Sequence, residues 1–217
     1  MTRSLFLLFV ALCPILVGQA AAQDKFEIRY AMVAYGTKRN ATLEDVVGRA
    51  SGLMTGGEIS LDTRLARAAA RLIGGSFAAD SGVEASGGVA MGDARLNVGP
   101  RAISGEVGYS VRALSGNYGT RRWTFYRVGI RSTLPLGASG FHASASAAFY
   151  LNVRGSGVPG TGSGKEAETR LTYIVPKLPI FLMVGYRLEG FTVNAARNTR
   201  PEELSGLLLG GGVRLGR

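Results

Sequence analysis

Apolar and polar residues alternate over long stretches of this chain, the pattern of a β-strand with two different faces. In the stretch 141–153, Phe141 and Phe149 share one face, whereas His142 and Ser144 share the other. The same alternation recurs in ten stretches of about 9–15 residues. These stretches are 25–36, 53–62, 63–77, 82–92, 101–113, 122–133, 141–153, 167–175, 180–191 and 204–215.

The length of these stretches favours strands that cross a membrane. A tilted strand needs about 9–11 residues to cross the hydrocarbon layer, whereas strands of soluble proteins are nearer to about 5–6. Backbone groups in hydrocarbon need internal partners, so such strands must close into a barrel. We therefore predict an all-β fold, an antiparallel up-and-down transmembrane β-barrel of ten strands.

One stretch also fits a helix. Ser60 can act as an N-cap, Leu61, Leu65 and Leu72 form one apolar stripe, and Gly74 begins a stop signal. This interpretation gives eight strands with a helical insertion near 60–75. Both strand counts remain open at the level of sequence.

The predicted connections alternate between short and long. The segments 62–63, 135–139 and 176–179 fit tight turns, whereas 37–52, 154–166 and 192–203 fit longer polar loops. Barrels of the bacterial outer membrane have short turns at the periplasmic end and longer loops outside. An even number of strands also places both ends of the chain on one side.

The first 22 residues have the pattern of a secretory signal peptide. Arg3 supplies the positive charge, 5–17 is a short apolar run, and Ala20 to Ala22 offer small residues for cleavage. We therefore expect a signal peptide over 1–22 and the barrel over 23–217. No later segment is apolar for about 18 residues, as a membrane-spanning helix requires.

The two faces of the strands predict two sets of residues. Apolar side chains should face lipid, and the mixed, arginine-rich faces should point inward, where buried charges need partners. The predicted lipid-facing residues are Val107, Tyr109, Val128, Ile130, Phe149, Leu182, Val184, Tyr186, Leu207, Leu209 and Val213. The predicted lumen charge network consists of Arg67, Arg71, Glu84, Glu106, Arg112, Arg127, Arg131, Arg170, Arg187, Glu189 and Arg214.

Composition narrows the possible chemistry. The single cysteine lies in the predicted signal peptide, so the exported chain is expected to have no disulfide and no zinc–thiolate site. We expect no metal and no other cofactor. Removing Arg3 leaves 24 basic and 15 acidic residues, a net charge of +9. Nucleic-acid binding would explain this charge but not the alternation, so we expect no nucleic-acid partner.

The last predicted strand carries a resemblance. The run from Ser205 to Leu215, SGLLLGGGVRL, is similar to the terminal strand of small Gram-negative outer-membrane barrels of the porin-like and OmpA-like class. The resemblance covers most of the exported chain as a pattern. It implies an outer-membrane location, assembly by the barrel-assembly machinery, and a monomeric barrel.

The sequence suggests three functions. The first is a non-enzymatic barrel with a packed polar lumen and a structural or surface-interaction role, in which loop arginines bind phosphates of lipopolysaccharide and other outer-membrane lipids. The second is a narrow anion channel, because arginine exceeds acid on the inward faces. The third is a lipid-modifying hydrolase that uses His142 with Ser144 or Ser146. We expect no catalytic residues and favour the first.

Overall fold

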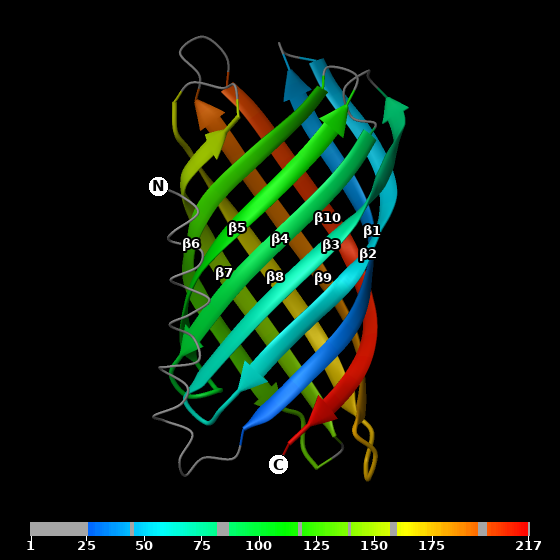
Figure 1. The fold of residues 1–217 in the computed structure, drawn as a ribbon, viewed down its shortest axis with the longest axis vertical. Coiled ribbons are helices and arrows are strands. Elements are labelled where there is room, and N and C mark those ends of the chain that lie inside the picture. The colour runs from blue at the N-terminus through cyan, green and yellow to red at the C-terminus, as the bar shows by residue number, and fades with distance from the viewer. Residues whose placement is uncertain are drawn as a thin grey trace.

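The chain folds into a closed barrel of ten antiparallel strands in the computed structural model (Figure 1). The structure describes residues 26–216 except 44–45, 82–86, 117–118, 139, 157–159 and 195–198. The predicted signal peptide over 1–22 and Glu84 therefore lie outside the described residues. The strands are β1 (Glu27–Leu43), β2 (Val46–Asp62), β3 (Ala66–Ser81), β4 (Gly87–Val98), β5 (Ser104–Gly116), β6 (Gly119–Pro135), β7 (Phe141–Gly155), β8 (Gly162–Ile174), β9 (Ile180–Asn194) and β10 (Thr199–Leu215).

Each strand pairs with its neighbours in the sequence, and the first strand pairs with the last. The register of this seam runs from Ile28 opposite Leu215 to Ala41 opposite Glu202. The prediction of a ten-stranded up-and-down barrel is thus confirmed. Within the described residues, no helix has the length and apolar character needed to cross a bilayer.

The alternative with a helix near 60–75 is wrong. Residues Ala66 to Phe77 pair with β4 on one side, and Arg67 to Ser81 pair with β2 on the other. Alanine and arginine are good helix formers in isolation, but helix propensities of ordinary residues differ by about 0.7 kcal/mol per residue at most. Hydrogen bonds to β2 along one edge of β3 and to β4 along the other outweigh this preference.

The connections at the end where β1 begins and β10 ends are short, as predicted, and the predicted long loops are mostly strand. The predicted loop 37–52 is occupied by β1 up to Leu43 and by β2 from Val46. Polar residues on the outer wall explain the error, since alternation of apolar and polar residues disappears where polar side chains such as Thr37 and Arg39 stand on the inner face and Lys38 stands on the outer face.

The outer wall is divided into two zones. Toward the end with the short turns it carries exposed apolar side chains, and we call this zone the apolar belt. Toward the opposite end it carries exposed polar side chains, and we call this zone the polar wall. Its charged members include Lys38, Arg49, Asp80, Arg122, Arg154, Lys165 and Glu203.

A β-bulge shapes the upper part of β7. The register between β7 and β8 shifts between Tyr150 and Val153, and Asn152 has a positive φ of 55°. Asparagine tolerates this left-handed conformation better than most residues. As a result Tyr150 and Val153 are both buried, with exposed fractions of 0%, while Arg154 beyond them is exposed on the outer wall.

Strand β4 corrects a prediction. In the predicted strand 82–92 the rule that apolar side chains face lipid puts Val89 and Met91 outside, but both are buried in the lumen, with exposed fractions of 5% and 2%. The outward residues Ala90, Gly92 and Ala94 are small, so the apolar side chains of this strand marked its inner face instead.

Candidate functional site

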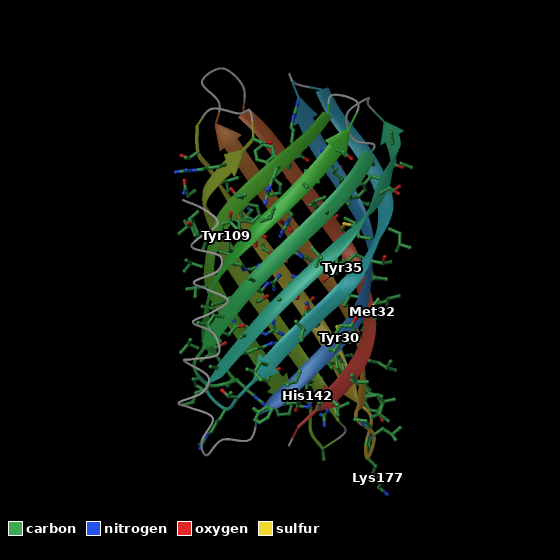
Figure 2. All side chains as sticks on the ribbon, viewed as in Figure 1. Tyr30, Met32, Tyr35, Tyr109, His142 and Lys177 are labelled. Atoms are coloured by element: carbon green, nitrogen blue, oxygen red, sulfur yellow. The ribbon has the colours of Figure 1, made fainter. Side chains whose placement is uncertain are left out.

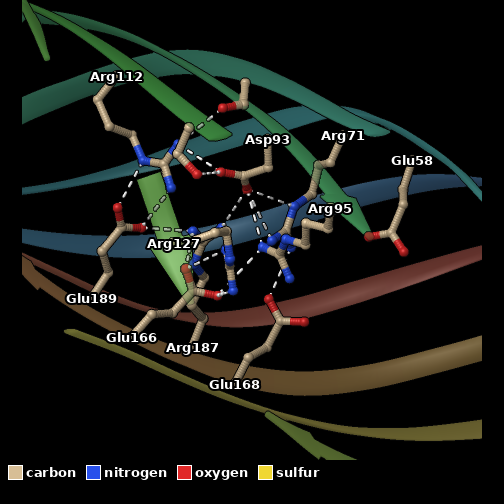
Figure 3. Close-up of polar contacts among 12 residues, drawn as sticks. Glu58, Arg71, Asp93, Arg95, Arg112, Arg127, Glu166, Glu168, Arg187 and Glu189 are labelled. Atoms are coloured by element: carbon tan, nitrogen blue, oxygen red, sulfur yellow. Dashed lines mark hydrogen bonds and ion pairs between the residues drawn. The ribbon is translucent and has the colours of Figure 1, made fainter. Parts of the chain in front are cut away.

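Ten charged side chains meet inside the barrel and form one continuous set of ion pairs, which we call the charge network (Figure 3). They come from six strands, β3, β4, β5, β6, β8 and β9. Its five arginines and five carboxylates are Arg71, Arg95, Arg112, Arg127, Arg187, Asp93, Glu106, Glu166, Glu168 and Glu189. Because the numbers are equal, the network is neutral when all its members are ionised.

Asp93 lies at the centre of this network. Its Oδ2 is 3.1 Å from Nη2 of Arg71 and 3.1 Å from Nη2 of Arg95, and its Oδ1 is 2.8 Å from Nη1 of Arg112. The hydroxyl of Ser110 donates a hydrogen bond of 2.7 Å to the same Oδ1. Nη1 of Arg187 lies 3.5 Å from Oδ2, so one carboxylate contacts four guanidinium groups, and the remaining positive charge is balanced by the four glutamates.

The ion pairs cross the lumen rather than follow its wall. Arg71 on β3 lies 2.9 Å from Glu168 on β8, and these strands stand on opposite sides of the closed ring. Arg112 on β5 reaches Glu189 on β9 at 2.8 Å. Side chains from opposite walls therefore meet in the middle, and they fill the bore at this level.

An aromatic cluster covers the network on the side of the polar wall. It consists of Trp123, Phe125, Tyr150 and Phe191, none more than 2% exposed. The rings of Phe125 and Tyr150 stack with centroids 4.2 Å apart, and Phe191 lies 5.6 Å from both Trp123 and Phe125. The guanidinium of Arg112 stands 5.2 Å from the Phe125 ring, and the Tyr150 hydroxyl donates to Glu166. The cluster is therefore bonded to the network beneath it.

Glycines opposite these large side chains make room for them. In the cross-strand register Gly155 faces Trp123 and Gly164 faces Tyr150. A Cβ added to Gly155 would come within 2.7 Å of the indole ring, and one added to Gly164 would come within 2.8 Å of the Tyr150 ring. Part of the high glycine content is thus a packing requirement of the lumen.

A cavity of about 230 Å³ opens at the other end of the barrel, where the short turns lie, and we call it the vestibule. Arginines from the wall and from the turns β2–β3 and β4–β5 line it, together with hydroxyl groups such as those of Ser104 and Ser144. Its deep end is closed by Arg170, whose two Nη atoms lie 3.1 and 2.8 Å from the Glu58 carboxylate.

The structure places ten of the eleven predicted network residues in the lumen, and it divides them between levels. Six of them belong to the charge network, namely Arg71, Glu106, Arg112, Arg127, Arg187 and Glu189. Arg67, Arg131 and Arg170 line the vestibule instead, and Arg214 lies 3.8 Å from Glu27 near the chain ends. The expectation that inward charges are paired does not hold for Arg131, a half-buried residue whose guanidinium forms no ion pair among the described residues and whose Nε has no hydrogen-bond partner there.

Sequence reasoning missed Asp93, Arg95 and Glu166. The signal for the first two was present, because the polar residues Asp93, Arg95 and Asn97 alternate with the non-polar residues Gly92, Ala94 and Leu96 directly after Met91. Glu166 was assigned to a loop. The ion pair of Arg39 with Glu202 was also missed; its two contacts of 3.1 and 3.0 Å join β1 to β10 across the seam.

The histidine–serine hypothesis receives no support from contacts among the described residues. His142 and Ser144 both line the vestibule, but no hydrogen bond described there joins them to each other or to a carboxylate. His142, the one histidine of the sequence, lies near the end with the short turns (Figure 2). In the same described part of the chain, no three His, Cys, Asp or Glu side chains gather as metal ligands would.

The predicted lipid-facing residues all lie on the outer wall. Phe149 is the most exposed of them at 69%, and only Tyr109 is half-buried, because its ring lies 5.5 Å from that of Tyr126. That lipid covers these side chains stays a prediction.

The fold defines a class of architecture, the closed up-and-down β-barrel, which solved proteins of bacterial outer membranes share. The outer-membrane protease OmpT of Escherichia coli is similar in structure, with a TM-score of 0.54 and 8% identity over 90% of this chain and 98% of that chain. The outer-membrane protein OprG of Pseudomonas aeruginosa matches over 88% and 96% of the two chains, at 9% identity and a TM-score of 0.33. No protein-family model matches the chain, and no curated protein sequence matches it significantly. At such low identity the likeness establishes the fold alone.

Proposed function

We propose that this chain is a resident outer-membrane barrel whose lumen is closed to solutes and whose role is structural and in surface contact. The observation that carries the proposal is the filled bore. Arg112 and Arg127 are 0% and 1% exposed in the middle of a ten-stranded barrel, and Trp123 and Tyr150 above them are 0% exposed. An ion would have to displace ion pairs and aromatic side chains from both walls.

The outer wall supports the location. Apolar residues continue along β10 from Leu215 to Leu207, whereas Glu203 beyond them is charged and exposed. This run of 9 residues corresponds to roughly 30 Å of strand at about 3.4 Å per residue, or about 22 Å of height at a tilt near 40°. The apolar band of outer-membrane barrels is about 25 Å tall. The end with the short turns would then face the periplasm, and the polar wall would project outward.

The polar wall supports a contact with lipopolysaccharide. Arg122, Arg154 and Lys165 are exposed on the neighbouring strands β6, β7 and β8. Arg122 and Arg154 lie beyond the last apolar residues of their strands, and Lys165 is the register partner of Phe149 at the edge of the apolar belt. Cations at this height would meet lipid phosphates, which guanidinium groups bind in a bidentate manner.

Conductance in planar bilayers tests the closed lumen. Purified barrel is first shown to be folded by its faster gel migration before heating, and it is then added to a planar bilayer. A general porin added to a second bilayer is the positive control, because it produces current steps under the same conditions. We expect no discrete current steps above background from the barrel. Steps that scale with the amount of barrel added would favour the anion channel instead.

Fractionation tests the location separately. Cells expressing the full chain should hold the heat-modifiable form in the outer-membrane fraction. Recovery of folded protein in the soluble periplasmic fraction would contradict the location and leave the closed lumen untouched.

A further inference from the structure

The vestibule is strongly positive, and the charge network above it is not. Its lining includes six arginines, Arg29, Arg64, Arg67, Arg101, Arg131 and Arg170, against the two carboxylates Glu58 and Asp62. The network beyond has five of each sign. Without the exposed turn residues Arg64 and Arg101, the lining still has four arginines against two carboxylates, so the described lumen is more positive at this end than in the network.

The two carboxylates of the vestibule are already engaged. Glu58 accepts hydrogen bonds from both Nη atoms of Arg170 and a third, of 3.2 Å, from Nη2 of Arg67. Asp62 lies 3.5 Å from Nε of Arg67 and 3.8 Å from Nε of Arg29. Neither carboxylate is within ion-pair distance of Arg131.

Arg131 gives the strongest argument that the vestibule binds an anion. It lines the vestibule, and its Nε is buried without a hydrogen-bond partner among the described residues. Arg67 and Arg170 line the same cavity, and no carboxylate of the described residues forms an ion pair with Arg131. A guanidinium among like charges is costly to bury without a counterion.

The other polar groups of the vestibule suit the same ligand. Thr133 and Ser144 contribute hydroxyl groups that can donate to a ligand beside the arginines. The volume corresponds to roughly eight water molecules at about 30 Å³ each. A tetrahedral oxyanion with a small substituent fits this volume and these donors.

We propose that the vestibule is a binding site for a small phosphate-type oxyanion, held by Arg131 with Arg67 and Arg170. The fork of Arg131 matches two phosphate oxygens, and bidentate contacts of this kind are among the strongest hydrogen bonds in proteins. Both Nη atoms of Arg170 and Nη2 of Arg67 already donate to Glu58, so these two arginines contribute positive charge around the anion. Arg64 and Arg101, exposed on the turns at the mouth, steer the anion inward. If the barrel resides in the outer membrane as proposed, the site opens to the periplasm.

The test uses folded barrel in a zwitterionic detergent, titrated with inorganic phosphate at constant ionic strength. Calorimetric binding and thermal unfolding are both followed, because a ligand that binds only the native state raises Tm in a saturable manner. We expect saturable binding and a rise in Tm for the wild type, and at least about tenfold weaker binding for Arg131→Met, since one charge-assisted contact is lost.

Two control variants separate binding from folding. Arg154→Met removes an exposed cation at the opposite end and should leave phosphate binding unchanged. Without phosphate, Arg131→Met should be at least as stable as the wild type, because it removes an unpaired buried charge. Should Arg131→Met fail to fold, Arg101→Gln at the mouth must weaken phosphate binding.

Three outcomes would overturn the site: no saturable binding, an equal response to chloride, or equal phosphate binding by wild type and Arg131→Met. The measurement is made in detergent, so a negative result says nothing against the location or the closed lumen. A barrel found to be soluble or conducting would likewise leave the binding result standing.

Discussion

The indole of Trp123 lies against Gly155, its register partner on the neighbouring strand, and a Cβ on Gly155 would approach the ring to 2.7 Å. Trp123 is the single tryptophan of the sequence and is 0% exposed, so its fluorescence reports on the aromatic cluster alone.

Gly155→Ala should push this indole out of place. Because overpacking a filled lumen costs about 1–3 kcal/mol, the free energy of unfolding should fall by that amount and the tryptophan emission should shift to the red. Urea unfolding followed by fluorescence measures both. Gly36→Ala is the matched control, since nothing lies within 4 Å of a Cβ at that position; equal losses for the two variants would rule out the steric argument.

Asp93→Asn should weaken the barrel more than any exposed substitution. The change leaves Arg71, Arg95 and Arg112 around a neutral amide in a site from which water is excluded. Removing one partner from a buried ion-pair set costs about 3–5 kcal/mol.

The control for this variant is Asp80→Asn. Asp80 is exposed and accepts a single hydrogen bond, from Ser51, so the change should cost about 1 kcal/mol or less. The measurement is equilibrium unfolding of both variants in the same vesicles. If Asp93→Asn unfolds at the wild-type urea concentration, the network does not stabilise the barrel.

The depth of the apolar belt predicts position-dependent costs along one strand. Leu209→Arg places a charge on the outer wall of β10 in the belt and should cost about 2–4 kcal/mol in a bilayer. Glu203→Arg, on the polar wall of the same strand, should cost about 0–1 kcal/mol. Unfolding from phospholipid vesicles compares them, and similar costs at both positions would argue against lipid contact.

Neutralising the basic group of the polar wall should release lipopolysaccharide. The variant with Arg122→Gln, Arg154→Gln and Lys165→Gln should retain several-fold less lipopolysaccharide per barrel after detergent extraction, because each cation supplies one phosphate contact. Lys177→Gln is the control. That lysine lies at the opposite end of the barrel (Figure 2), in the turn between β8 and β9. Unchanged retention in the triple variant would contradict the proposed contact.

The strand count and the faces of most strands follow from the sequence because alternation is enforced by contact with two different media. Predictions failed where that contrast is weak. Beside Ala90, Gly92 and Ala94 the outer wall has almost no side chain, so the apolar residues Val89 and Met91 indicated the wrong face. Near Lys38 and Arg49 the outer side chains are polar, so the sequence lacks alternation there and segment 37–52 was predicted to be a loop.

The pairing inside the lumen could not be predicted for a different reason. Alternation places Arg71 and Glu168 on inner faces, but they stand 97 positions apart in the chain. Which carboxylate meets which guanidinium depends on strand tilt and register, quantities that no local pattern contains. Arg131 was therefore grouped with the paired arginines.

The contacts that cross the lumen also constrain the order of assembly. Arg71, Asp93 and Arg112 belong to the first half of the chain, and Glu168, Arg187 and Glu189 belong to the second. If the barrel resides in the membrane as proposed, an open sheet of only the earlier strands would expose guanidinium groups without their glutamates, which is costly in hydrocarbon. The sheet would therefore have to curl, neutralise its interior charges and enter the bilayer in one concerted process. The pairing of β10 with β1 would be the last step.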